Sequence, residues 1–168
     1  LVVGITASGS TPYTLGALRA ARDIGAGTVA ITTTPGSPVT ELAEVAIVVP
    51  VGPEVVRGST RMKAGTAQKL VLNMFSTAVA VRLGKVYGDL MVEVQPANDK
   101  LKRRAREIVQ AVTGCTAAAA AEALVRCEYE VKTAIVCVEK GLTPAQAREL
   151  LREARGHLRA VLEGNSDG

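Results

Sequence analysis

The first fifty residues alternate between short apolar runs and polar turns that contain glycine or proline. The runs at 1–7, 28–32 and 46–51 are rich in Val, Ile and Ala and have the length of buried strands. Between them, residues 12–25 and 39–43 carry apolar side chains at helical spacing. Strands and helices that alternate in this way predict a parallel sheet with right-handed crossovers.

A long helix is predicted after these three strands, ending at Gly84. Ser59 or Thr60 would cap its N-terminus, because both side chains can accept a hydrogen bond from a free backbone N–H. Its predicted apolar stripe consists of Met62, Ala67, Leu70, Val71, Met74, Ala78 and Val81. Such a stripe is typical of a helix that packs on a core.

An irregular segment at residues 87–96 separates two types of pattern. Everything beyond Asn98 is predicted to be helical. We therefore expect an α/β domain at 1–96 and a small all-helical domain at 97–168.

The helical region contains an internal repeat. Gly114-Cys-Thr116 recurs as Gly141-Leu-Thr143, an offset of 27 residues (141 minus 114). At the same offset Ala120 matches Ala147, Glu122 matches Glu149, Leu124 matches Leu151, Val131 matches Leu158 and Lys132 matches Arg159. Each copy predicts a cap, a helix, a tight turn and a second helix. Two copies are too few for a solenoid, so we expect a compact helical module of UBA-like character.

Composition excludes two classes of partner. The formal charge is +4, but four aromatic residues provide no stacking platform for single-stranded nucleic acid. The basic run from Lys100 to Arg106 has helical spacing and predicts a solvated helix face. No apolar run reaches the roughly 18 to 20 residues that a membrane span requires. We expect neither nucleic acid nor membrane as a partner.

Cysteine usage indicates the compartment. Cys115, Cys127 and Cys137 are odd in number and show no CxxC spacing. We interpret them as buried, reduced thiols rather than as a disulfide framework or a zinc site. A cytoplasmic protein is therefore expected.

The turn after the first strand could bind an anion. Gly9 would let the backbone approach a ligand closely, and Ser8, Ser10 and Thr11 supply hydroxyl donors before a helix whose N-terminus is electropositive. The residues alone equally allow an ordinary Ser/Thr cap. The turn has neither a P-loop ending nor a GxGxxG pattern, so nucleotides are not expected.

The second candidate segment runs from Gly52 to Lys69. It places the carboxylate of Glu54 and the hydroxyls of Ser59 and Thr60 near the start of the long helix. Glu54 could transfer protons if the sheet edge shields it from water, or it could be an ordinary loop residue.

Three segments, Ala7–Tyr13, Thr34–Pro38 and Gly52–Lys69, resemble the N-acetylmuramic acid 6-phosphate etherases, a family related to the glucokinase regulatory protein. The chain is more distantly similar to the sugar-isomerase (SIS) half-domains of glucosamine-6-phosphate synthase. The resemblance implies a three-layer, flavodoxin-like SIS sheet that is N-terminally incomplete. It also implies a homodimer.

The resemblance further implies a site and a reaction. Ser8, Gly9, Ser10 and Thr11 would hold the 6-phosphate of a small-molecule sugar phosphate, with Ser59 and Thr60 lining the same pocket and Glu54 as a candidate acid/base. The family is a lyase that cleaves the D-lactyl ether of N-acetylmuramic acid 6-phosphate. The products are N-acetylglucosamine 6-phosphate and D-lactate, in cell-wall sugar recycling, and no cofactor or metal is needed.

The sequence departs from the family in one respect. The Gly-Ala-Gly-Thr-Ser-Gly-Arg loop of the etherases, and the glutamates usually assigned the acid and base roles, lie upstream of the matched region. We therefore expect the chain to correspond to the C-terminal portion, with the sheet completed by a preceding segment or another chain. Alone, it should bind sugar phosphate weakly and have little or no activity.

Two other functions stay open. A non-catalytic sugar-phosphate regulator of the glucokinase regulatory protein type would use the same turn, although such proteins carry two SIS domains. An SIS-type phosphosugar isomerase would keep Glu54 as its base.

Overall fold

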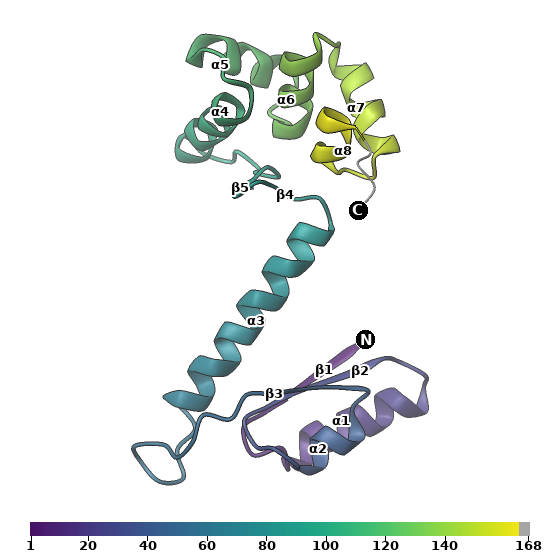
Figure 1. Cartoon of the computed structure of the whole chain (residues 1–168), viewed down its shortest axis with the longest axis vertical. Coiled ribbons are helices and arrows are strands. Elements are labelled where there is room, and N and C mark those ends of the chain that lie inside the picture. Colours follow the sequence, from purple (N-terminus) through teal and green to yellow (C-terminus); the bar gives the residue numbers. More distant parts are fainter. Residues whose placement is uncertain (165–168) are drawn as a thin grey trace. The chain divides into compact units, whose positions relative to one another are not determined.

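The computed structural model describes residues 1–164 (Figure 1). Contacts within the chain divide it into two compact units, Leu1–Ser76 and Thr77–Gly168. Each unit is described by itself.

The first unit is an α/β structure, as the apolar runs predict. Its elements are β1 (Val2–Thr6), α1 (Pro12–Asp23), β2 (Thr28–Thr32), α2 (Pro38–Leu42) and β3 (Val45–Val48). The three strands form one parallel sheet in the order β1-β2-β3. The prediction of a parallel sheet with helical crossovers is therefore confirmed.

One face of the sheet is covered by α1 and α2. Leu18 of α1 and Val39 of α2 are fully buried and form one cluster with Ala30 of β2. Gly4 of β1 makes room for α1, because a Cβ there would approach Leu18 Cδ1 to 2.8 Å. Small residues in the strands thus allow the two helices to pack closely on the sheet.

The opposite face of the sheet consists of β-branched aliphatic residues. The strand register aligns them in two rows, Val3–Val29–Val45 and Ile5–Ile31–Ile47. Ile31 is buried, but Ile5 is 39% exposed and Val45 is 54% exposed. This Val/Ile face is therefore only partly covered in the unit.

The long helix α3 (Lys63–Arg82) is present, but its predicted packing is wrong. Among the seven residues of the predicted stripe only Val71 is buried. Leu70 and Met74 are 56% and 63% exposed. Apolar residues occupy consecutive positions, as at 70–72 and 74–75, so they cover a wider part of the helix surface than the predicted stripe.

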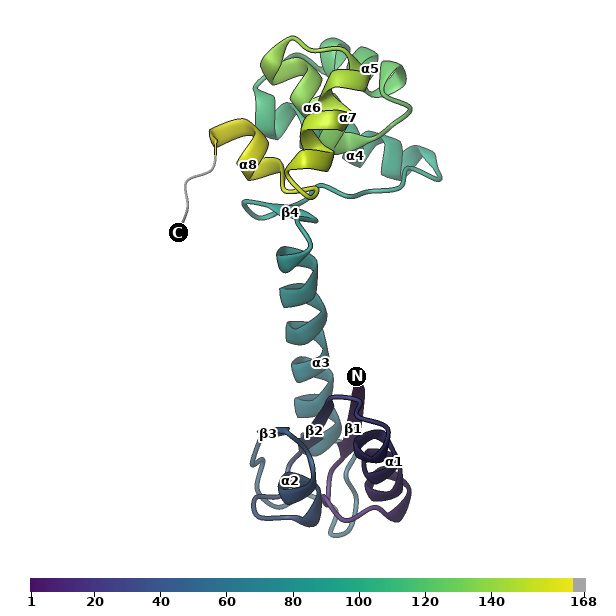
Figure 2. The ribbon, with the colours of Figure 1, turned by 90° about the vertical axis from the view of Figure 1, so that its right-hand side faces the viewer.

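Up to residue 164, the second unit contains the end of α3, a hairpin and five further helices (Figure 2). The hairpin and these helices are β4 (Val86–Tyr87), β5 (Leu90–Met91), α4 (Asp99–Thr113), α5 (Ala117–Arg126), α6 (Val131–Lys140), α7 (Pro144–Glu153) and α8 (Leu158–Glu163). One core joins the helices, and Leu124, Ile135 and Leu158 are among its fully buried side chains. The solvated basic face is confirmed, since the Lys and Arg residues between 100 and 106 are exposed and Ala105 is buried.

The internal repeat is confirmed at the level of the backbone. Gly114 and Gly141 both end their helices in the left-handed region, with φ of 67° and 64°. Two residues later, the hydroxyls of Thr116 and Thr143 each accept the N–H of the third following residue. Thr143 also forms the expected capping box with Gln146.

The tight turn inside each repeat copy also recurs. Glu128 and Tyr129 have φ of 55° and 62°, and the equivalent Arg155 and Gly156 have φ of 51° and 79°. Helices α5–α6 and α7–α8 are therefore two copies of one helix pair. The UBA-like character of the helical module stays a prediction, as does a boundary at 96/97.

Within residues 1–164, no single helix is long and apolar enough to cross a membrane. Only α4 and α5 taken together meet the criteria of length and composition, and they are bent by 112°.

Candidate functional site

The β1–α1 turn lies at the carboxyl end of β1. Gly9 is buried and has a φ of 70°, a left-handed conformation that favours glycine. Ser8, Ser10 and Thr11 are exposed around it. Ser8 Oγ accepts a hydrogen bond from the backbone N–H of Ser10 at 3.3 Å and one from its hydroxyl at 3.2 Å. Three hydroxyls thus surround one buried glycine.

The N-terminus of α1, directly after this turn, has no side-chain cap from residues 1–164. Thr11 occupies the N-cap position, but its hydroxyl hydrogen-bonds to Thr6 Oγ1 at 2.7 Å instead. Pro12 follows and has no N–H. The next two N–H groups, those of Tyr13 and Thr14, lie too early in the helix to find a carbonyl within it. The positive end of the helix dipole therefore stays open to an anion.

The loop after β2 packs on the same turn. The carbonyl oxygen of Ala7 accepts hydrogen bonds from the hydroxyls of Thr32, Thr33 and Thr34 at 3.2, 2.9 and 2.9 Å. The carbonyl of Gly9 accepts the N–H of Val39 at 3.0 Å. These bonds fix the position of the turn relative to β2 and α2.

Glu54 caps the N-terminus of α3. Its Oε1 accepts the N–H groups of Lys63 and Ala64, each at 3.1 Å, and its Oε2 accepts Lys63 N–H at 3.2 Å. Lys63 Nζ also donates to the carbonyl of Pro53 at 2.9 Å. The carboxylate holds the Gly-Pro-Glu loop against the start of the helix.

The prediction that Ser59 or Thr60 caps α3 is wrong. The helix begins at Lys63, after both residues. Ser59 Oγ accepts the N–H of Arg61 at 3.4 Å, and the carbonyl of Thr60 accepts the N–H of Gly65 at 2.9 Å. Among residues 1–164, the hydrogen bonds of Glu54 and Ser59 stay within their own loop and helix start.

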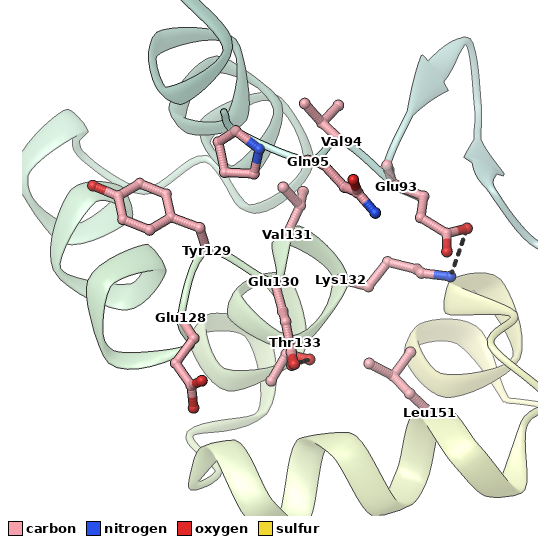
Figure 3. A pocket seen from close by; sticks show the side chains of 12 residues that line it. Glu93, Val94, Gln95, Glu128, Tyr129, Glu130, Val131, Lys132, Thr133 and Leu151 are labelled. Carbon is pink, nitrogen blue, oxygen red and sulfur yellow. Dashed lines mark hydrogen bonds and ion pairs between the residues drawn. The ribbon is translucent and has the colours of Figure 1, made fainter. Parts of the chain in front are cut away.

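A pocket in the helical unit was not predicted (Figure 3). It encloses about 320 Å³ between the segment before α4 and the α5–α6 turn. On one side Glu93 and Lys132 form an ion pair at 3.8 Å. Lys132 Nζ also donates to the carbonyl of Gly156 at 3.1 Å. Much of the lining comes from a linker and a turn, for which no periodic pattern exists in the sequence, and the rest from α6 and α7.

The negative charge of Glu130, which lines this pocket, is balanced by an ion pair with Arg148. Its Oε2 accepts hydrogen bonds from Arg148 Nε at 2.7 Å and from Thr133 Oγ1 at 2.8 Å. The hydrogen bond from Arg148 is the main reason that the pKa of Glu130 lies below its usual value. Glu93 thus binds Lys132 within the pocket, and Glu130 binds Arg148 outside its lining.

The cysteines are free thiols, as expected, and Cys127 and Cys137 are buried as predicted, whereas Cys115 is only partly buried. Cys127 Sγ and Cys137 Sγ lie 3.6 Å apart. Burial raises the pKa of the Cys127 thiol to about 12, which disfavours the nucleophilic thiolate. Within the described part of the chain, no three His, Cys, Asp or Glu residues gather in a way that could hold a metal ion.

Two family models match the chain. An SIS domain matches residues 1–78, which include the β1–α1 turn and Glu54. The C-terminal lid domain of glucokinase regulatory protein matches residues 88–135.

Curated relatives match almost the whole chain. The N-acetylmuramic acid 6-phosphate etherase of Edwardsiella ictaluri is 53% identical over 163 residues, which are 97% of this chain and 54% of that protein. The etherase of Yersinia pestis strain Pestoides F is 54% identical over 162 residues, 96% of this chain and 55% of that protein. The chain is a homologue of the N-acetylmuramic acid 6-phosphate etherases. The resemblance inferred from the sequence is therefore confirmed. The chain spans about half the length of the curated relatives it matches.

Proposed function

We propose that this chain forms part of an N-acetylmuramic acid 6-phosphate etherase. Such a carbon–oxygen lyase releases D-lactate from the 3-position of the amino sugar and leaves N-acetylglucosamine 6-phosphate, a step of cell-wall sugar recycling. The proposal is supported by 53–54% identity to proteins of that name across 96–97% of the chain. An identity of this size extends through both units rather than through the SIS region alone.

The observation that carries the proposal is the open N-terminus of α1. A phosphate there would receive the N–H groups of Tyr13 and Thr14 and the hydroxyls of Ser8 and Ser10. Hydrogen bonds to an ionised group are roughly twice as strong as those between neutral groups. Ser8, Gly9, Ser10 and Thr11 therefore stay our candidates for the 6-phosphate site.

Glu54 stays a candidate acid/base, with a second role added. The reaction requires that the C2 proton be removed and that the C3–oxygen bond to lactate be broken, after which water adds to C3. A carboxylate beside the sugar could carry one of these protons. Because Glu54 also caps α3, its loss should affect stability as well as turnover. Ser59 and Thr60 would line the sugar-phosphate pocket together with Glu54.

A regulatory function is the second candidate. The match of residues 88–135 to the lid domain of glucokinase regulatory protein favours it. A regulator would bind the sugar phosphate at the same turn and would release no lactate. The two functions therefore differ in turnover and agree in binding.

We further propose that the chain assembles as a homodimer in the cytoplasm, with a small sugar phosphate as its other partner and neither nucleic acid nor membrane. The partly covered Val/Ile face and the exposed Leu70, Met74 and Phe75 of α3 supply apolar surface for an interface. Light scattering coupled to size exclusion tests this assembly, and a monomer at micromolar concentration would contradict it.

Two measurements test the function. In calorimetry, the chain should bind N-acetylglucosamine 6-phosphate and should not bind N-acetylglucosamine, because the turn recognises the phosphate. Equal affinity for both sugars would contradict the proposed site. In an assay with N-acetylmuramic acid 6-phosphate, the chain alone should release little or no lactate, and release at rates typical of enzymes would contradict our assignment of the acid and base.

A further inference from the structure

One buried hydroxyl beside the β1–α1 turn has no hydrogen-bond partner among residues 1–164. Ser37 precedes α2 and is only 4% exposed. Its Oγ is fully buried, and within the described residues it forms no hydrogen bond. It occupies the N-cap position of α2 but does not cap that helix. A buried hydroxyl without a partner raises the free energy of the folded protein, so a role for it is expected.

The Ser37 side chain points at Gly9. A Cβ placed on Gly9 would lie 1.9 Å from Ser37 Oγ and 2.3 Å from Ser37 Cβ. The hydroxyl thus fills the space that any side chain at position 9 would need. Thr32 Oγ1 lies 3.2 Å from the same point, but it already donates to the carbonyl of Ala7. Ser37 is therefore the unpartnered hydroxyl that the second loop presents to the turn.

We propose that Ser37 is a phosphate-binding residue, whose hydroxyl donates a hydrogen bond to a phosphate oxygen held at the β1–α1 turn. The inference rests on the proposed function and adds a second loop to its site. The phosphate would then be held from the first loop by Ser8 and Ser10 and from the second by Ser37. A phosphate suits this position because its oxygens are acceptors, which a buried hydroxyl donor lacks here.

Thr40 provides a matched control on the same short helix. Its Oγ1 donates to the carbonyl of Ser37 at 2.7 Å, so its hydroxyl is satisfied within the protein. Removal of the Thr40 hydroxyl should lower stability and leave phosphate affinity unchanged. Removal of the Ser37 hydroxyl should do the reverse, because no hydrogen bond to the described residues is lost.

The test compares wild type, Ser37→Ala and Thr40→Ala by calorimetry with N-acetylglucosamine 6-phosphate and by thermal unfolding without ligand. We expect Ser37→Ala to weaken binding by about tenfold or more, the effect of one hydrogen bond to a charged group, with an unchanged or higher Tm. Thr40→Ala should bind within about twofold of wild type and unfold at a lower temperature.

Three outcomes would overturn the inference, and they differ in meaning. Unchanged affinity in Ser37→Ala would remove Ser37 from the site and leave the proposed function intact. A loss of affinity in Ser37→Ala together with a lower Tm would show that the hydroxyl supports the loop rather than the ligand. If wild type does not prefer the phosphorylated sugar over N-acetylglucosamine, the proposed function fails and the role of Ser37 fails with it.

Discussion

Two helices of the first unit begin at the loops that the sequence marked as candidate sites, and their N-termini differ. The N-terminus of α3 is occupied by the carboxylate of Glu54, which accepts the N–H groups of Lys63 and Ala64. The N-terminus of α1 has no such cap in the part of the chain that the structure describes, because Thr11 bonds to Thr6 instead. Both ends attract negative charge for the same physical reason. One already holds an anion from its own chain, and the other is available to a ligand.

The largest expected effect comes from Gly9→Ala, which should disrupt the open site. A Cβ at this position would collide with Ser37. The alanine would also have to adopt the left-handed φ of 70°, which is disfavoured for residues other than glycine. We expect a loss of about 3 kcal/mol in the free energy of unfolding and no detectable binding of N-acetylglucosamine 6-phosphate. Urea denaturation and calorimetry measure the two effects.

Gly36→Ala is the matched control for that change. Gly36 has a similar φ of 62°, but a Cβ there meets no atom of the described residues within 4 Å. The loss in the free energy of unfolding of Gly36→Ala should be limited to the strain of the left-handed backbone, about 1 to 2 kcal/mol. Equal losses in the two variants would show that the contact between Gly9 and Ser37 has no energetic importance.

Removal of two hydroxyls at the β1–α1 turn should weaken ligand binding at the N-terminus of α1 without unfolding the chain. Ser8→Ala with Thr11→Ala should weaken binding of N-acetylglucosamine 6-phosphate by about tenfold or more. Stability should fall by only about 1 kcal/mol, through the lost bond between Thr11 and Thr6. Calorimetry that gives wild-type affinity would contradict this placement of the phosphate.

Changes at the N-terminus of α3, which Glu54 caps, should alter the stability of the protein. Glu54→Ala should cost about 1 kcal/mol, with a range of 0.5–2 for a lost cap, while the affinity of the β1–α1 turn for phosphate stays unchanged. Glu54→Gln retains an acceptor and should cost less. In the full-length protein, Glu54→Gln should lower turnover more than binding, and normal kcat would give Glu54 a structural role only.

The smallest effect is expected at a third helix start. Glu130 precedes α6, and its hydrogen bond from Arg148 is the main cause of its lowered pKa. A lowered folded pKa means that this contribution to stability is present above the ordinary value of 4.5 and is lost as pH falls through the folded pKa. Arg148→Ala should thus lower Tm slightly at pH 7, because the pair is half-exposed, and the difference should disappear in acid. A difference that grows in acid would contradict this reasoning.

Local patterns predicted most of the fold. β2 has the predicted bounds, and the repeat at 27 residues predicted the paired caps at Thr116 and Thr143. These features depend on neighbours within a few positions, which a single sequence displays. The burial of α3 could not be predicted in the same way, because burial depends on what packs against a helix and not on its own pattern alone, and Leu70 and Met74 are exposed.

The sequence predicted which residues lie in the two candidate loops, but not the hydrogen bonds and packing contacts that they form. The hydroxyls around Gly9 follow from the Ser-Gly-Ser-Thr pattern. The cap by Glu54 does not, because the carboxylate comes from nine residues before the N–H of Lys63 and capping rules are local. Ser37 looks like any N-cap before proline in the sequence. Only its burial and its missing hydrogen bond distinguish it.

The comparison of the two helix starts is tested most directly by following their backbone amides in a titration with N-acetylglucosamine 6-phosphate. The account predicts that the amide resonances of Tyr13 and Thr14 shift in ¹⁵N–¹H spectra as the phosphate binds. The amide resonances of Lys63 and Ala64 should not shift, because their N–H groups already donate hydrogen bonds to Glu54. Shifts confined to Lys63 and Ala64, or no shift at Tyr13 and Thr14 at saturating ligand, would contradict it.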